Sequence, residues 1–296
     1  MTFPADPLIS VVIVTHNRCL EVIRALKSVI AQTYGNREII VIDNGSRDGT
    51  GEALRRQFPE ITYRYLPENV GCPEGRNRGI QLATGEWLFF LDDDAWCPPD
   101  HLARALAILR EAPPGVKVLM PQIQEWIQDQ WQPRFHTGRQ QWLASFSGGV
   151  SLIHRSVFQE IGLYPDTLYG AEEKYLAVQL ITRGRQILLD PSLTVYHQPS
   201  DSRSPGDLFR QKVQNDMLWV LRFAPRWLAL PSLAVKSLVW LQAGLRRGHF
   251  RAGWRGCGKG WKQWQEMFRG NRRLTTSAYW QYIRFRKQVK REIGPA

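Results

Sequence analysis

The chain has few cysteines, and their spacing suits neither a zinc site nor a disulfide framework. Its 296 residues include four, which lie far apart with no C-x-x-C pair: Cys19, Cys72, Cys97 and Cys257. A reducing, cytosolic setting fits this pattern. The first ten residues, MTFPADPLIS, lack the basic and apolar regions of a secretion signal. Internal repeats and low-complexity runs are not evident. The length suits one large α/β domain, or one domain with an appendage.

Acidic residues are scarce in the last third of the chain. Residues 201–296 hold 20 Lys or Arg but only 5 Asp or Glu, whereas residues 1–200 hold 19 and 22. The formal net charge of +12 is therefore a property of the tail, which also contains seven of the twelve tryptophans. We expect a main domain over residues 1–200 and a basic helical tail over residues 201–296 that meets an anionic surface.

The first hundred residues alternate between strand-like and helix-like patterns. Strands are predicted over Ile9–Val14, Glu38–Ile42, Ile61–Leu66 and Glu86–Leu91. Helices are predicted between them, over Leu20–Gln32, 48–58 and Gly75–Ala83. This β-α-β-α order predicts a doubly wound, mostly parallel, Rossmann-like sheet.

The following hundred residues continue with weaker signals. Asp100–Glu111 and Glu172–Arg183 are predicted helices, and Gln122–Gln141 is predicted to be a hairpin or a loop. Short strands are predicted over Val116–Pro121, Gly148–Ile153, Arg185–Leu189 and Leu193–Tyr196, the last ending at His197.

Three consecutive carboxylates, Asp92, Asp93 and Asp94, follow the apolar run Trp87–Leu91. A continuous apolar run of this length is typical of a strand buried on both faces, and open parallel sheets bind ligands at the carboxyl ends of their strands. Adjacent anions repel one another, so we expect a cation, or a ligand that carries one, to complete the site. A turn or helix cap leading into Pro98–Pro99 is the structural alternative.

Polar clusters also follow the other predicted strands: Thr15 to Arg18, Asp43 to Ser46, and Asn69 to Gly79. Each alone would be an ordinary turn. Together, at successive strand ends, they indicate a binding edge. Arg18 and Arg76 suit phosphate groups, and the carboxylate of Asp43 can accept a hydrogen bond from a nucleobase N–H.

These motifs identify a family resemblance. VVIVTHNR, VIDNGSRDGT, NVGCPEGRNRGI, LFFLDDDAW, SGGVSLIHRSVFQEIGLY and AEEKYLAVQLITRG stand in the order found in family 2 glycosyltransferases. The chain resembles that family, of the rhamnosyltransferase-like or related bacterial polysaccharide type, over about residues 8–200. The resemblance implies a GT-A fold, with a nucleotide-sugar-binding half over residues 1–98 and an acceptor half over residues 99–200.

The resemblance also implies roles for individual residues. Asp43 would contact the base, and the rest of the nucleotide-sugar site would comprise Thr15, Asn17, Arg18, Arg76, Asn77, Asp92 and Asp93. Asp92 would face the ribose, and Asp94 would bind Mn²⁺ or Mg²⁺, which favour carboxylate and phosphate oxygens. Asp92 and His197 are further candidate ligands. A lone histidine is otherwise more often a structural hydrogen-bonding residue.

The E-E pair at the start of a predicted helix resembles the family's catalytic acids. We expect Glu173 to be the catalytic base, with Glu172 as the substitute, although acids in a first turn also stabilise a helix without doing chemistry. Trp142, Gly148 and Gly149 are weaker candidates for the sugar or acceptor pocket. The implied reaction is an inverting, metal-dependent transfer from a UDP- or dTDP-sugar to a hydroxyl, on a lipid-linked or surface-polysaccharide acceptor. A nucleotidyltransferase and a non-catalytic membrane or nucleic-acid adaptor are the alternatives.

The tail contains one long apolar segment, Trp227–Leu245. It is nearly long enough to span a bilayer, but Lys236 and Pro231 make spanning costly. A helix lying in the interface suits the basic and tryptophan-rich composition better, and would place the protein peripherally on the cytosolic face of the membrane. A soluble helical appendage is the alternative, and nucleic acid is a weaker competitor as a partner.

Overall fold

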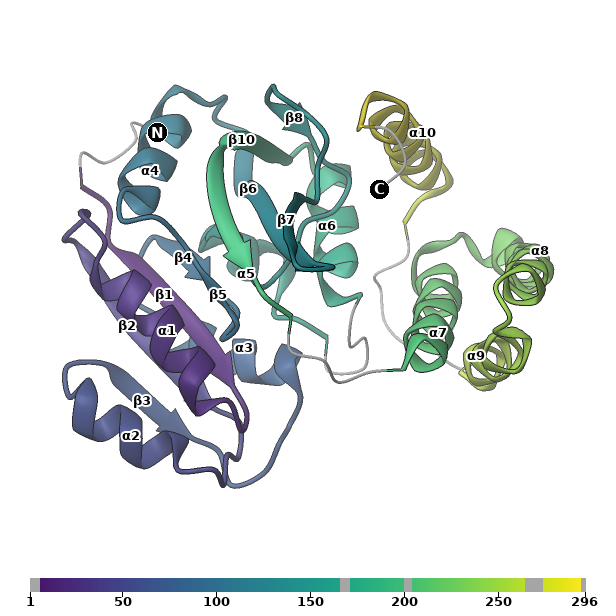
Figure 1. Ribbon diagram of the computed structural model, residues 1–296. Helices are drawn as coiled ribbons and strands as arrows, with labels where there is room; N and C mark the ends of the chain where they lie inside the picture. Colours follow the sequence, from purple (N-terminus) through teal and green to yellow (C-terminus); the bar gives the residue numbers. More distant parts are fainter. Residues whose placement is uncertain (1–5, 166–170, 200–203, 264–273, 294–296) are drawn as a thin grey trace. The chain divides into compact units, whose positions relative to one another are not determined.

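The computed structural model describes residues 6–165, 171–199, 204–263 and 274–293. These residues form two compact units (Figure 1). The first contains residues 6–165, 172–199 and 286–293, and the second contains residues 171, 204–263 and 274–285. Each unit is described separately below.

A ten-stranded sheet forms the first unit. Eight of its strands follow the order β3-β2-β1-β4-β9-β6-β10-β5, while β7 pairs with β6 and β8 pairs with β10. The strands are β1 (Ile9–Thr15), β2 (Arg37–Asp43), β3 (Thr62–Tyr65), β4 (Trp87–Phe90), β5 (Ala95–Trp96), β6 (Val116–Ile127), β7 (Gln130–Pro133), β8 (Gln141–Trp142), β9 (Leu152–His154) and β10 (Gln186–His197). The pairs β1–β2, β1–β4, β2–β3 and β6–β10 are parallel, and β9 joins the two parallel parts by antiparallel pairing. The predicted mostly parallel α/β sheet is confirmed.

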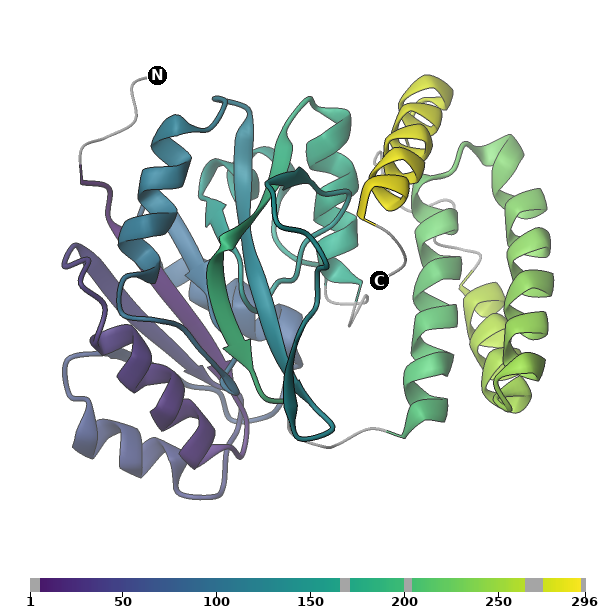
Figure 2. The same cartoon turned by 45° about the horizontal axis from the view of Figure 1, so that its top comes forward.

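Helices cover both faces of this sheet (Figures 1 and 2). One face carries α1 (Cys19–Ile30), α2 (Thr50–Gln57) and α4 (His101–Glu111), and the other carries α3 (Cys72–Leu82), α5 (Ser156–Ile161) and α6 (Glu172–Thr182). Successive residues of β4 point to opposite faces: Phe89 meets His101 of α4, and Phe90 meets Phe158 of α5. This double coverage explains why the strand is apolar at every position.

Two glycines bring α3 unusually close to β1. A methyl group at Gly75 would lie 2.7 Å from the side chain of Val14, and one at Gly79 would lie 2.3 Å from Val12. Both distances are shorter than carbon atoms tolerate, so only glycine fits at these positions. The contact fixes the helix against the strand one residue before Arg76.

Three predicted elements of the first unit differ from the structure. The strand predicted over Gly148–Ile153 is found as β9, which covers only Leu152–His154, because Gly148 and Gly149 form a turn before it. Residues 185–189 and 193–196 were expected as separate strands, but β10 is one strand with a register shift between Asp190 and Thr194. The predicted strand Val116–Pro121 extends to Ile127, and β7 pairs back on it as a hairpin. Hairpin and loop were both open for this segment, and the structure shows the hairpin.

The second unit is helical. It contains α7 (Pro205–Phe223), α8 (Arg226–Arg246), α9 (Phe250–Lys262) and the first part of α10 (Thr276–Ile293). Glycines of α9 again permit close packing: methyl groups at Gly256 and Gly260 would lie 2.8 Å from Val213 and 2.5 Å from Met217 of α7. The helical tail predicted for this region is present over the described residues.

Candidate active site

The three acids after β4 lie in a turn, and each forms an ion pair with an arginine of the protein. Arg18 Nη1 lies 2.8 Å from Asp93 Oδ1 and 3.0 Å from Asp94 Oδ2. Both aspartate side chains are buried, whereas that of Asp92 is 34% exposed. Burial raises the pKa of Asp93 to about 6, and the charge of Asp94 reinforces it while Arg18 opposes it. Arg18, expected to meet phosphate, therefore holds two carboxylates together.

His197 ends β10 beside the same turn. Its Nε2 lies 3.1 Å from Asp94 Oδ1, and potential ligand atoms of Asp92, Asp94 and His197 all lie within 4.8 Å of one another. The structure thus brings together the three residues expected to hold a metal. Two carboxylates and an imidazole are a donor set that suits Mn²⁺ and also other divalent transition metals.

Glu125 stands behind the histidine and was not singled out in the sequence. Its Oε1 lies 3.6 Å from His197 Nδ1, and it also forms an ion pair with Arg134. These partners lower the pKa of Glu125 to about 2, with the histidine as the largest influence. Burial lowers the pKa of His197, but the carboxylates of Asp94 and Glu125 outweigh it and raise that pKa to about 9. A carboxylate at Nδ1 orients a histidine so that Nε2 faces a metal.

The catalytic acids expected on α6 lie around a buried arginine. Arg76 Nη1 lies 3.1 Å from Glu173 Oε1 and 3.4 Å from Glu172 Oε1, while its Nη2 lies 3.2 Å from Asp92 Oδ1. The backbone N–H of Gly148 also donates to Glu173 Oε1, at 3.1 Å. Arg76 thus ties the α6 acids to the acidic turn, and Glu172 is the more buried of the two.

Gly148 and Gly149 lie so close to these acids that no side chain would fit at either position. A methyl group at Gly148 would come within 2.5 Å of Glu173 Oε1, and one at Gly149 would lie 1.9 to 2.0 Å from the carboxylate atoms of Asp92. The carbonyl of Gly149 also accepts a hydrogen bond from the N–H of Asp92, at 2.6 Å. The two glycines therefore form the wall on which Asp92 and Glu173 rest.

Asp43 lies at the carboxyl end of β2, next to Thr15 at the end of β1. It is buried, and it accepts hydrogen bonds from Ser46 N at 2.8 Å and from the Tyr63 hydroxyl at 2.6 Å. Tyr63 was not singled out in the sequence. A carboxylate can accept further bonds, so this arrangement fixes Asp43 without using all of its acceptor capacity.

Two amides expected at the nucleotide site have structural partners. Asn17, at φ 52°, accepts a bond from the N–H of Arg47, while its own N–H donates to Ser46. Asn77 exchanges two hydrogen bonds with the backbone of Tyr164. Asn17 ties the loops after β1 and β2 together, and Asn77 ties α3 to the segment after α5. Their contacts with a nucleotide stay a prediction.

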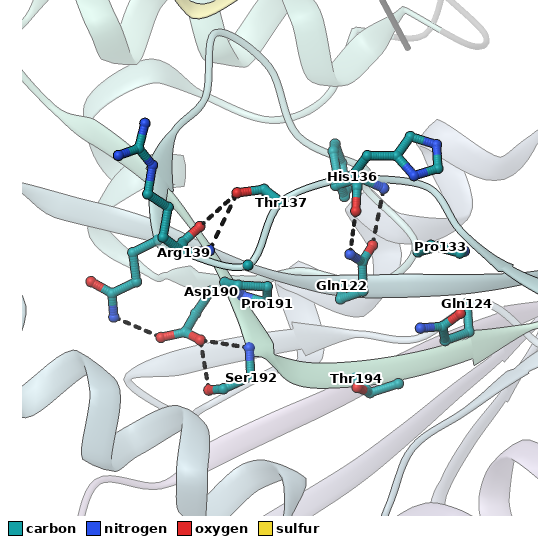
Figure 3. A pocket seen from close by; sticks show the side chains of 13 residues that line it. Gln122, Gln124, Pro133, His136, Thr137, Arg139, Asp190, Pro191, Ser192 and Thr194 are labelled. Atoms are coloured by element: carbon teal, nitrogen blue, oxygen red, sulfur yellow. Dashed lines mark hydrogen bonds between the residues drawn. The ribbon is translucent and has the colours of Figure 1, made fainter. Parts of the chain in front are cut away.

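The structure does not bring Trp142 to the acidic turn. It pairs with Leu188 near the start of β10, whereas His197 ends that strand. A polar hollow of about 640 Å³ lies elsewhere in the first unit, lined by Gln122 and Gln124 of β6 and by the bulge of β10 (Figure 3). Since strand side chains alternate, these glutamines lie on the opposite face of β6 from Glu125, so the hollow is separate from the acidic turn.

Comparison with known proteins agrees with the family resemblance predicted from the sequence motifs. The model of the family described as glycosyl transferase family 2 matches residues 10–162. An uncharacterized glycosyltransferase of Haemophilus influenzae is 27% identical over 198 residues, covering 64% of this chain and 65% of that protein. A PGL/p-HBAD biosynthesis glycosyltransferase of Mycobacterium bovis is 30% identical over 164 residues, covering 54% and 64%. The match therefore spans slightly less than two thirds of these relatives.

Solved structures share the fold at lower identity. The crystal structure of GalNAc-T7 with UDP, GalNAc and Mn²⁺ has a TM-score of 0.61 and 21% identity, covering 75% of this chain and 49% of that one. The mannosyltransferase PcManGT from Pyrobaculum calidifontis, in complex with GDP-Man and Mn²⁺, has a TM-score of 0.58 and 17% identity, covering 95% and 80%. The fold is that of GT-A glycosyltransferases, as predicted. Because the family model matches more than half of its residues, this chain belongs to glycosyl transferase family 2.

Proposed function

We propose that the protein is a metal-dependent, inverting glycosyltransferase that moves a sugar from a nucleoside-diphosphate sugar to a hydroxyl group. One observation carries the proposal: the ligand atoms of Asp92, Asp94 and His197 lie within 4.8 Å of one another. Arg76 connects this cluster to Glu173, because it forms ion pairs with both Asp92 and Glu173. A metal site and a candidate base therefore share one cation and one edge of the sheet.

The residues of the cluster fit a divalent metal. Asp94 and His197 are side by side at 3.1 Å, an arrangement that a bound cation would stabilise in place of a proton. When bound, Mn²⁺ or Mg²⁺ would neutralise the negative charge of the departing nucleoside diphosphate. Arg18 keeps Asp94 in place from the side opposite the histidine, because it bonds the other carboxylate oxygen.

Glu173 is the better candidate for the base that takes the proton of the acceptor hydroxyl. Its side chain is 17% exposed, compared with 4% for Glu172. Within the part of the chain that the structure describes, the hydrogen bonds to its carboxylate converge on Oε1, from Gly148 and Arg76. This leaves Oε2 for the acceptor, while Oε1 fixes the orientation of the group. Glu172, buried against Arg76, then has a positioning role.

We propose a UDP- or dTDP-sugar as the donor, with Asp43 at the base. The structural neighbours were solved with UDP or GDP-Man, which supports a nucleotide sugar of some kind. For the acceptor we propose a lipid-linked or surface-polysaccharide glycan at the cytosolic face of a membrane. The basic second unit supports that location, as does α8, the one helix among the described residues long and apolar enough to cross a bilayer.

Release of nucleoside diphosphate tests the proposal. The purified chain is incubated with UDP- and dTDP-sugars and glycan acceptors, with Mn²⁺, with Mg²⁺ or with a chelator. We expect release that requires metal and falls at least 100-fold in Asp94→Asn and Glu173→Gln. Asp129→Asn is the control, since Asp129 lies in the exposed β6–β7 turn and asparagine tolerates its φ of 59°. Activity that survives both the chelator and Asp94→Asn would refute the metal role, and retained anomeric configuration would refute inversion.

A further inference from the structure

Helix α8 has its apolar face on the outside. Its outward positions recur every three or four residues, which is one side of a helix. Six large apolar side chains on this side are 50–70% exposed: Trp227, Leu230, Val235, Leu238, Val239 and Leu245. The opposite side buries Ala229, Leu233 and Gly244, and there Lys236 forms an ion pair with Asp216 of α7. A soluble helix shows the reverse arrangement, with its charge outside.

Helix α9 packs beside α8 and exposes aromatic and basic side chains. Phe250, Trp254 and Trp261 are 38–63% exposed, and four exposed cations stand beside them on the same helix, Arg251, Arg255, Lys259 and Lys262. Tryptophan and basic residues on one surface are typical of helices that lie in the headgroup region of a membrane. The two helices together therefore present an apolar strip with a basic, aromatic border.

A basic pocket of about 520 Å³ lies at the end of the apolar strip. It is lined by the start of α7, the end of α8 and the start of α9. Arg210, Arg251 and Arg255 line it, and its acid, Asp207, lies 3.1 Å from Arg210. Neither Arg251 nor Arg255 has an ion-pair partner among the residues that the structure describes. Three guanidinium groups and one carboxylate thus line this hollow, and its net positive charge suits phosphate, which arginine binds through paired N–H donors.

The pocket and the apolar strip are continuous, because Leu245 belongs to both. We propose that this surface docks on an anionic phospholipid bilayer, with α8 lying in the interface and a lipid phosphate in the Arg210–Arg251–Arg255 pocket. The proposal rests on the membrane location given under the proposed function and adds the docking surface and its ligand. Spanning is disfavoured, because α8 is packed along one side against α7 and α9 and holds its Lys236–Asp216 ion pair there.

Vesicle flotation with the purified full-length chain tests the docking. We expect binding to vesicles of phosphatidylcholine with 30% phosphatidylglycerol and at least tenfold weaker binding to phosphatidylcholine alone. The double variant Leu238→Ser/Val239→Ser should weaken binding at least tenfold, because it removes two exposed apolar side chains. Leu82→Ser, on the exposed end of α3, is the control and should bind like the wild type. Equal binding of the double variant and the wild type would overturn the docking surface.

A matched pair of charge variants tests the pocket. Arg251→Gln/Arg255→Gln and Arg246→Gln/Arg247→Gln each remove two exposed charges, but only the first pair lines the pocket. Loss of two surface charges should weaken binding to the anionic vesicles about 30-fold, and the pocket pair should lose at least tenfold more. Equal losses would show a diffuse basic surface and overturn the phosphate site.

Two further experiments complete the test: one asks whether the pocket itself binds phosphate, and the other separates vesicle binding from transfer activity. Inorganic phosphate, at an ionic strength matched with NaCl, should compete with the anionic vesicles for the wild type and not for Arg251→Gln/Arg255→Gln. Competition that is equal in both proteins would overturn the pocket as the phosphate site. The Asp94→Asn variant should bind vesicles like the wild type, so a failure of the transfer activity and a failure of the docking are distinguishable.

Discussion

Replacing Gly149 by alanine should disable the proposed metal site through a single methyl group. The methyl would lie 1.9 Å from Asp92 Oδ2, and real contacts of this kind do not fall below 3.0 Å. The carboxylate must therefore move by about 1 Å. Bonds between a metal and its ligands tolerate only about 0.2 Å of displacement, so Asp92 could no longer serve as the proposed ligand.

The expected cost is large for activity and small for stability. A displacement of about 1 Å at a reacting centre lowers the rate about 100-fold, and we expect that loss in nucleoside diphosphate release. An off-rotamer side chain costs about 1 kcal/mol, which corresponds to a fall in Tm of roughly 2–4 °C for a domain of this size. Nucleoside diphosphate release measures the loss of activity, scanning calorimetry measures the fall in Tm, and a metal titration by isothermal calorimetry measures the loss of metal binding.

The control variants make the reasoning refutable. Gly35→Ala should have no effect on activity, because a methyl group there meets no atom within 4 Å. In an Asp92→Ala background the clash no longer exists, so Gly149→Ala should cause little further loss. If Gly149→Ala lowers activity equally in the wild type and in Asp92→Ala, the displacement of Asp92 is not the cause and the reasoning fails.

Three further predictions follow from the site and the core. Glu125→Gln should weaken Mn²⁺ binding about 10- to 100-fold in a competition titration, because the residue orients His197; unchanged affinity would contradict that role. Arg76→Met should lower the free energy of unfolding by about 3–5 kcal/mol, since it leaves buried carboxylates without their cation, and Arg76→Lys should lose less in urea titrations. Burial lowers the pKa of His101 to about 4, below its unfolded value, so its contribution to stability is complete above about pH 6.5 and declines as the pH falls towards 4. The wild type should lose about 3 kcal/mol more than His101→Phe over that interval in urea titrations, and parallel curves would show that His101 is not buried as a neutral group.

Periodicity and strand-end chemistry predicted the frame of the first unit. Local patterns are sufficient for the central strands, because β4 is apolar throughout, β1 and β2 are mostly apolar, and the turns after β1, β2 and β3 carry glycine or asparagine. They were insufficient at β10, where Pro191 and Ser192 resemble a break between two strands. The bulge accommodates these residues while pairing with β6 continues on both sides. Such a bulge depends on the partner strand, which a local pattern does not contain.

The candidate site shows the same division. The acids Asp92 and Asp94 and the histidine of β10 were named from motifs, and the fold brings them together. The partners of those groups were not foreseen. Arg18 and Arg76 were assigned to phosphate, which stays a prediction, and their ion pairs with carboxylates were not expected. Glu125 was overlooked because it stands on a hairpin far away in sequence. A sequence motif identifies candidate functional residues, whereas tertiary packing determines which ion pairs those residues form.

The close contact of α3 with β1 ties the hydrophobic core to the chemistry. Gly75 and Gly79 set the distance of α3 from the sheet, and the side chain of Arg76, between them in sequence, reaches the acid after β4 and the acids of α6. An added methyl group on Val12 or Val14 would lift the helix and carry the guanidinium with it. Substitutions beneath α3 should therefore behave as active-site mutations, although they touch no substrate. The size of the valines in the first strand therefore sets the position of the Arg76 guanidinium relative to the acids of the candidate site.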